Sequence, residues 1–205
     1  MIPEDTLIDV IQQEATEDVQ RISAAPVATS YFEMSLWQLL YKRSFILAIL
    51  LMMGSLTSFI VGHFESTLTP FLILFFTMLV STGGNTGGQT SAIAIQAMSS
   101  GDLNEKNAMR FIGREFLIGT MLALVLGSLT FARVYVWYGE FTGSLVVSLS
   151  LGLIVLMSVL LGACLPVVLK KLDVDPAFSA NPLLATVMDI LGIFIYCYVA
   201  YLVLT

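Results

Sequence analysis

The chain has 205 residues, of which 57% are hydrophobic and only 12% are charged, and its net charge is −6. Because a soluble domain carries about 25% charged residues, this composition predicts an integral membrane protein and excludes a soluble globular domain. The negative charge argues against a nucleic-acid partner, since phosphate binding requires a basic face. Cys164 and Cys197 both lie in apolar runs, which favours packing over a disulfide or a metal site.

The first 24 residues have the pattern of an amphipathic helix. Apolar residues recur at helical spacing from Leu7 to Ile22, and the acidic residues lie mostly off that stripe. The segment lacks the basic n-region of a secretory leader, so we expect a cytoplasmic N-terminus. Its acidic face either is simply solvated or gathers cations. Residues 25–43 are predicted to be a juxtamembrane linker.

Five apolar segments approach or exceed the roughly 20 residues that a membrane-spanning helix requires. They cover residues of about 44–62, 70–98, 113–132, 143–169 and 181–204, which predicts an all-α membrane domain over residues 44–205. With the N-terminus inside, eight of the nine basic residues lie on the inner side: Arg21, Lys42, Arg43, Lys106, Arg110, Arg114, Lys170 and Lys171. This bias predicts an outer C-terminus.

Small residues recur at every fourth position in three of these segments. The rows are Gly54, Ser58 and Gly62; Gly119, Ala123 and Gly127; and Ser144, Ser148 and Gly152. Such rows allow helices to approach closely in lipid. The sequence leaves open whether each contact forms within one subunit or between two.

The second segment contains the glycine-rich stretch STGGNTGGQ, residues 81–89. One interpretation is a loosened, pore-lining helix, because non-helical backbone at membrane depth is tolerated only where protein or water satisfies it. The alternative is that the glycines allow close helix contact. Asn85, Thr86 and Gln89 add oxygen atoms, and an oxygen-rich site without sulfur or histidine suits Mg²⁺ or Ca²⁺.

Asp189 lies within the last apolar segment, about seven helical residues and therefore roughly 10 Å from Pro182. No basic residue of that segment can neutralise it. A carboxylate at such depth costs at least about 2.5–3.5 kcal/mol, so it usually faces a bundle interior or a water-filled path. Two subunits that place Asp189 on a shared axis would match the charge of a divalent ion. Ala185 and Gly192 share its helical face, and they would leave room for hydrated Mg²⁺, which retains its waters.

Three stretches resemble the membrane domain of the MgtE family of Mg²⁺ channels and its eukaryotic solute-carrier relatives. They are DVIQQEATEDVQRISA, STGGNTGGQTSAIAIQAMSSGDL and LKKLDVDPAFSANPLLATVMDILGIFIY. The resemblance implies a homodimer of five-helix subunits in the cell (inner) membrane, with a pore on the two-fold axis. It implies Mg²⁺ as the transported ion and ligand, and no enzymatic activity.

The resemblance also assigns roles to particular residues. It implies that Asp189 holds hydrated Mg²⁺ with Asn85, Ala185, Gly192 and Gly84. Further positions are expected to line the pore or its inner mouth: Gly83, Thr86, Gly87, Gln89, Thr186 and Asp175. A regulatory plug helix would carry Glu14, Glu17 and Asp18. The family normally has an upstream cytosolic Mg²⁺ sensor, which is not part of this sequence, and often an arginine where this chain has Gln96.

Three other functions compete with a channel. A proton- or sodium-coupled divalent-cation exchanger of the same fold would show cation uptake that follows an imposed gradient of the coupling ion. A membrane enzyme would require a nucleophile with a base or a metal cluster, and His63 has no evident partner in the sequence. A structural scaffold would not explain why a carboxylate, Asp189, lies within an apolar segment.

Overall fold

The computed structural model describes residues 35–174 and 176–205, and in these residues it contains helices and no strand. The helices are α2 (Leu36–His63), α3 (Pro70–Ile73), α4 (Phe76–Ser99), α5 (Ala108–Tyr138), α6 (Phe141–Lys171) and α7 (Pro176–Leu204). The all-α prediction is therefore confirmed for the described part of the chain. The predicted plug helix over residues 1–24 lies outside it, as does Asp175.

Four of the five predicted spans are long and apolar enough to cross a membrane. They are Pro70–Ser99, Ala108–Tyr138, Phe141–Lys171 and Ala180–Leu204, whereas the apolar part of α2, Leu47–His63, is shorter. Helix α2 begins at Leu36 rather than near residue 44, because neither proline nor glycine interrupts the sequence between Leu36 and Gly54. Trp37 and Tyr41 on this added part are exposed, as residues at a membrane interface are.

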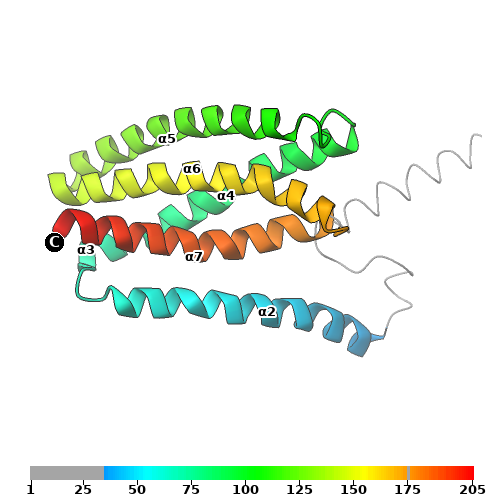
Figure 1. The fold of residues 1–205 in the computed structure, drawn as a ribbon. Coiled ribbons are helices and arrows are strands. Elements are labelled where there is room, and N and C mark those ends of the chain that lie inside the picture. Colours follow the sequence, from blue (N-terminus) through cyan, green and yellow to red (C-terminus); the bar gives the residue numbers. More distant parts are fainter. Residues whose placement is uncertain (1–34, 175) are drawn as a thin grey trace, which may run out of the picture.

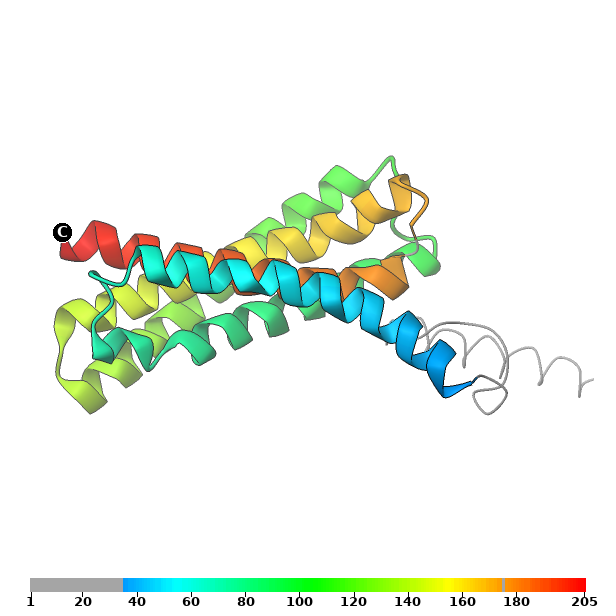
Figure 2. The ribbon, with the colours of Figure 1, turned by 90° about the horizontal axis from the view of Figure 1, so that it is seen from below.

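Helix α6 lies at the centre of the bundle, where it packs against α4, α5 and α7. Helices α5 and α2 occupy opposite edges, and α2 packs chiefly against α7 (Figures 1 and 2). The main core lies where α4, α6 and α7 meet, and its fully buried side chains include Leu79, Ile154, Val155, Leu184 and Met188. This arrangement leaves one side of α4 and α7 without cover from α5 or α6.

The predicted span at 70–98 is broken once, at Leu74 and Phe75, between α3 and α4. Helix α3 starts because Pro70 occupies its first turn and the Thr69 hydroxyl accepts a hydrogen bond from the Leu72 backbone N–H at 3.4 Å. The buried Tyr196 hydroxyl of α7 donates to the Leu72 carbonyl at 2.9 Å. A side chain from another helix therefore stabilises the break, as buried backbone groups require.

The glycine-rich stretch is not loosened, so that part of the interpretation is wrong, while its pore-lining role stays a prediction. Helix α4 runs without interruption from Phe76 to Ser99. Gly83 and Gly87 instead allow close contact with α6: the Ser158 hydroxyl donates to the Gly83 carbonyl, and a methyl group on Gly87 would lie 2.5 Å from that hydroxyl oxygen. On α6, a methyl group on Gly162 would collide with the Gly87 carbonyl oxygen. Small residues on both helices therefore set the distance between α4 and α6.

The structure also shows which helices two of the three rows of small residues bring together. A methyl group on Gly127 of α5 would lie 3.3 Å from the Ser148 carbonyl oxygen of α6, and one on Gly152 would lie 3.5 Å from the Ala123 carbonyl oxygen. These rows therefore pack α5 on α6 within one subunit. The row on α2 differs, because nothing lies within 4 Å of a methyl group placed on Gly54 or Gly62.

We predict that Gly87→Ala destabilises the protein, whereas Gly84→Ala does not. The added methyl at residue 87 meets Ser158, and such overpacking typically costs 1–3 kcal/mol. A methyl at residue 84 of the same helix meets nothing within 4 Å, and alanine favours a helix over glycine by up to about 1 kcal/mol. Thermal unfolding of the two purified variants in one detergent provides the comparison. Equal midpoints would contradict the close α4–α6 contact.

Candidate functional site

Helix α4 has a buried face and an exposed polar face. Gly83, Thr86 and Gly87 are buried, and the Thr86 hydroxyl donates back to the Thr82 carbonyl at 2.7 Å. Ser81, Asn85 and Gln89 are exposed and follow one another at intervals of four residues. Because residues four apart lie on one side of a helix, these three form a polar stripe that faces away from α6.

Helix α7 presents a matching exposed edge. Ala185 and Asp189 are exposed, while Leu184, Thr186 and Met188 beside them in the sequence are buried. The Thr186 hydroxyl donates to the Pro182 carbonyl at 3.2 Å, so it satisfies the acceptor that lies one turn earlier. Asp189 is the only acidic residue in the α7 sequence.

The α4 stripe and the α7 edge lie side by side. Gly83 faces Met188, and Gly87 faces Leu184, so α4 and α7 run antiparallel with a defined register. The same register places Ser81 near the level of Asp189 and Asn85 near the level of Ala185. We call the exposed residues along this contact the polar seam: Ser81, Asn85, Gln89, Ala185 and Asp189.

Asp189 also lines a groove of about 860 Å³ between α2, α4 and α7. Helix α4 contributes Thr77 and Ser81 to the groove, beside apolar residues. Helix α2 contributes its row of small residues with their neighbours: Gly54, Thr57, Ser58, Val61 and Gly62. The carboxylate at membrane depth thus borders open space rather than a packed apolar wall.

The predicted site residues fall into two groups. Asp189, Asn85, Ala185 and Gln89 lie on the exposed side, and the half-buried Gly84 has free space around its Cα. The others are buried at helix contacts: Gly83, Thr86, Gly87, Thr186 and Gly192. A methyl group on Gly192, for example, would lie 3.8 Å from Val80. Glu14, Glu17, Asp18 and Asp175 lie outside the described residues.

Sequence analysis missed several residues around Asp189. Ser81 and Thr77 continue the four-residue spacing of Asn85 and Gln89 toward the start of α4. This repeat in the sequence indicates that all four residues lie on one side of the helix. The participation of α2 could not be read in this way, because it depends on how α2 packs against α7. Glu115, a buried carboxylate on α5, was also missed, and it does not line the groove.

The donor atoms along the polar seam are oxygens of a carboxylate, a hydroxyl and two amides. Hard cations such as Mg²⁺ and Ca²⁺ prefer these ligands. Among the described residues, no three side chains of His, Cys, Asp or Glu form a group that could hold a metal ion. The arrangement in one chain thus presents a single carboxylate with neutral polar groups beside it.

Comparison with known proteins places this arrangement in a family. The MgtE family model, described as a divalent cation transporter, matches residues 76–199, which contain all of the polar seam. Two similar proteins are called magnesium transporter MgtE. The one from Thermus thermophilus is 39% identical over 98% of this chain and 45% of its own length, and the one from Bacillus subtilis is 34% identical over 94% and 43%.

A third protein with the same printed name, from Enterococcus faecalis, is 28% identical over 96% of this chain and 43% of its own length. The chain therefore spans less than half the length of the curated relatives that it matches. The family model alone covers more than half of the chain, from the start of α4 almost to the end of α7. The chain belongs to the MgtE family of divalent cation transporters, which is a family of transporters rather than of enzymes.

Proposed function

We propose that the chain conducts hydrated Mg²⁺ across the membrane through a pore that two copies form along their polar seams. The three similar proteins bear the name of a magnesium transporter. The observation that carries the proposal is the exposure of Asp189 in the apolar helix α7, beside Ser81 and one turn along the seam from Asn85. The proposal covers a passive channel, with coupled exchange as the alternative that experiment must separate.

A polar seam cannot face lipid at low cost. A carboxylate in the hydrocarbon region costs at least about 2.5–3.5 kcal/mol and normally faces a bundle interior or a water-filled path. The free side of α4 and α7 in one chain provides no such cover. A second copy that packs around the same seam would enclose it, and a closed two-fold arrangement is the commonest form of homo-oligomer.

Two copies would also complete the electrostatics of the site. Each α7 carries one carboxylate, so a pair of Asp189 side chains offers two negative charges to a divalent ion. Mg²⁺ loses its waters reluctantly, and it is therefore held best through water by acceptors at a distance. The small residues Ala185 and Gly84 leave room for those waters, while Ser81, Asn85 and Gln89 provide hydrogen-bond partners for them.

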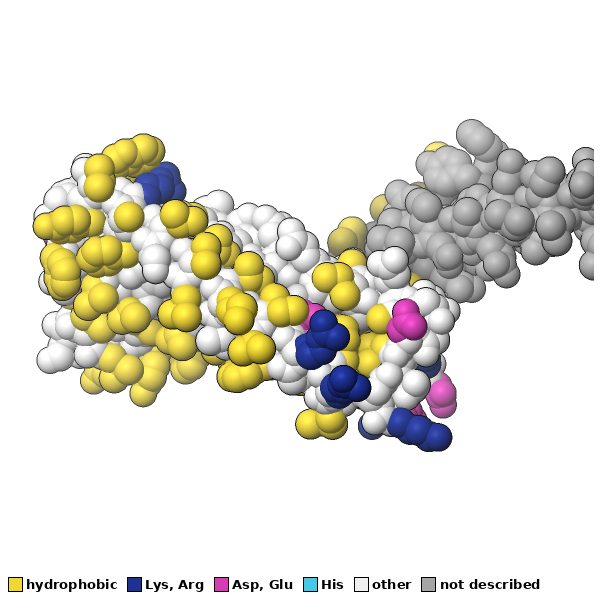
Figure 3. All heavy atoms as spheres, turned by 90° about the horizontal axis from the view of Figure 1, so that it is seen from above, with side chains coloured by type: hydrophobic (Ala, Val, Ile, Leu, Met, Phe, Trp, Pro, Cys, Tyr) yellow, Lys and Arg dark blue, Asp and Glu magenta, His cyan; other side chains and the backbone are white. Residues whose placement is uncertain are grey.

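The remaining assignments complete this proposal. Apart from Arg133 near the end of α5, the Lys and Arg residues of α5 and α6 gather at one end of the bundle, which we place in the cytoplasm, with the C-terminus outside (Figure 3). Asp175 follows α6 in the sequence and would lie at the inner mouth. Glu14, Glu17 and Asp18 would belong to a plug helix that closes the pore, under control of a cytosolic sensor such as the family carries upstream.

We predict that Asp189→Asn and Asp189→Ala each reduce Mg²⁺ flux into proteoliposomes by at least about tenfold. Both variants remove the charge that stabilises the passing ion, and tenfold corresponds to about 1.4 kcal/mol in the barrier. Flux is measured with Mg²⁺ as the only ion gradient. Glu65→Gln is the control, because Glu65 is an exposed carboxylate that follows α2 and lies outside the groove.

The flux experiment has three informative outcomes. Passive flux that is lost in both Asp189 variants and kept in Glu65→Gln supports the channel. Wild-type uptake that occurs only with an imposed proton or sodium gradient would replace the channel by an exchanger. Unchanged flux in Asp189→Ala would remove Asp189 from the conduction path, even if the protein transports Mg²⁺ by another route.

We predict that Ala185→Cys forms a disulfide between two subunits under mild oxidation, whereas Val125→Cys does not. Both positions are exposed in one chain, but Ala185 lies on the polar seam and Val125 lies on α5 at the opposite edge. Cys164 and Cys197 are replaced by alanine in both variants, so that each chain has one thiol. Crosslinked dimers on a non-reducing gel report the result, and equal crosslinking at both positions would contradict a dimer built on the seam.

A further inference from the structure

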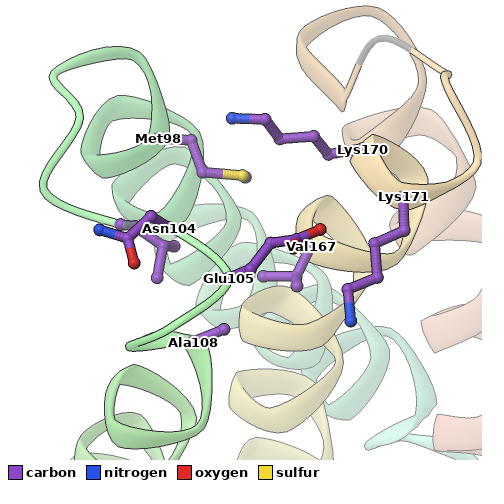
Figure 4. A pocket seen from close by; sticks show the side chains of 8 residues that line it. Met98, Asn104, Glu105, Ala108, Val167, Lys170 and Lys171 are labelled. Carbon is purple, nitrogen blue, oxygen red and sulfur yellow. The ribbon is translucent and has the colours of Figure 1, made fainter.

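A second cavity lies at the basic end of the bundle, far along the helices from Asp189. It has a volume of about 280 Å³ and lies between the α4–α5 loop and the last turns of α6. Its lining residues are Met98, Leu103, Asn104, Glu105, Ala108, Val167, Lys170 and Lys171 (Figure 4). One water molecule occupies about 30 Å³ of liquid, so the cavity is large enough for a polar headgroup fragment.

The α4–α5 loop holds this cavity in a defined shape. The Leu103 backbone N–H donates to the Ala97 carbonyl at 2.8 Å, and the Asn107 side-chain amide donates to the Asp102 carbonyl at 2.7 Å. The backbone N–H of Asn104 donates to the Asn107 side-chain oxygen at 2.8 Å. A small apolar cluster around the buried Leu103, Ala94 and Ala108 fixes the loop on the helices. The loop that borders the cavity is therefore held by its own hydrogen bonds and apolar contacts.

The cavity has an apolar wall and a charged rim. Met98, Leu103, Ala108 and Val167 form the wall. Lys170 and Lys171 lie in the last turn of α6 and are exposed, and Figure 4 shows the Lys170 side chain reaching across the mouth toward Met98. Glu105 extends into the same space from the loop. With one carboxylate and two ammonium groups, the rim carries a net positive charge.

The position of the cavity at the helix ends favours a membrane lipid as its ligand. Helix α4 ends at Ser99, α5 begins at Ala108 and α6 ends at Lys171, so the cavity lies at the ends of three membrane helices, where lipid headgroups are found. Lysines near helix ends extend toward the membrane surface, where anionic phosphates gather. A free phosphate ion would use the lysines but would gain nothing from the apolar wall. An anionic phospholipid uses both.

We propose that this cavity binds the phosphate headgroup of an anionic phospholipid. Lys170, which crosses the mouth, would donate a charge-assisted hydrogen bond to the phosphate, and Lys171, which extends along α6, would add a second positive charge at the rim (Figure 4). The glycerol and the first acyl carbons would lie against Met98 and Val167. Glu105 opposes the binding and limits its affinity. A lipid at this position would bridge the α4–α5 loop to α6 and so stabilise the basic end of the bundle.

Two variants with opposite expected effects test the proposal. Native mass spectrometry of the whole purified chain, titrated with phosphatidylglycerol, gives an apparent Kd for bound lipid. From the usual contribution of one basic residue near an anionic surface, Lys170→Gln with Lys171→Gln should weaken binding roughly 30-fold. Glu105→Gln should tighten it about fivefold. All three residues are exposed, so folding is not expected to depend on them.

The matched control is Lys106→Gln with Arg110→Gln, which removes the same charge from exposed positions that do not line the cavity. Lipid binding that falls in the Lys170 and Lys171 variant, remains in the control and rises in Glu105→Gln supports the site. Equal losses in both double variants would overturn it in favour of general surface attraction. Equal binding of phosphatidylcholine, or displacement of the lipid by inorganic phosphate alone at similar concentration, would overturn the choice of an anionic lipid.

Discussion

The close contact between α4 and α6 is the constraint on which the rest of the described structure depends. Gly83 and Gly87 of α4 meet Ser158 and Gly162 of α6. A side chain at Gly87 or Gly162 would force the two helices apart. In lipid, where no hydrophobic force drives one apolar helix onto another, such packing and hydrogen bonding provide the driving force. Gly83, Gly87 and Gly162 therefore have a structural role, although Gly83 and Gly87 lie beside residues that we assign to ion conduction.

The polar seam is a consequence of that contact. Once one face of α4 is committed to α6, the residues offset from it, Asn85 and its neighbours one turn before and after, must point outward. The register between α4 and α7 then brings Asp189 to the same side. A single chain thus presents the polar seam on its surface, and this is the physical reason for the proposal that a second copy packs there.

The charge on the chain is divided between regions with different tasks. Asp189 stands in an apolar span, where charge is costly and indicates function. Lys170 and Lys171 stand at the end of α6, where charge is stable and meets the membrane surface. Hydrophobic side chains cover much of the face in Figure 3, and Arg133 lies near the end of α5 away from the α4–α5 loop. Helix lengths thus fit a membrane-embedded chain, and the placement of charge is the basis for the proposed orientation.

The sequence by itself determined the all-α class, four of the five predicted spans and the unusual position of Asp189. The length of an apolar segment and the presence of a charge within it are local properties of the sequence, and both decide how the segment behaves in a bilayer. It could not decide whether the glycines of residues 81–89 loosen a helix or tighten a contact, since composition is the same in both cases. That choice depended on Ser158 and Gly162, more than 70 residues away in the chain. Only the tertiary structure brought these partners together and so decided which oxygens of α4 are exposed.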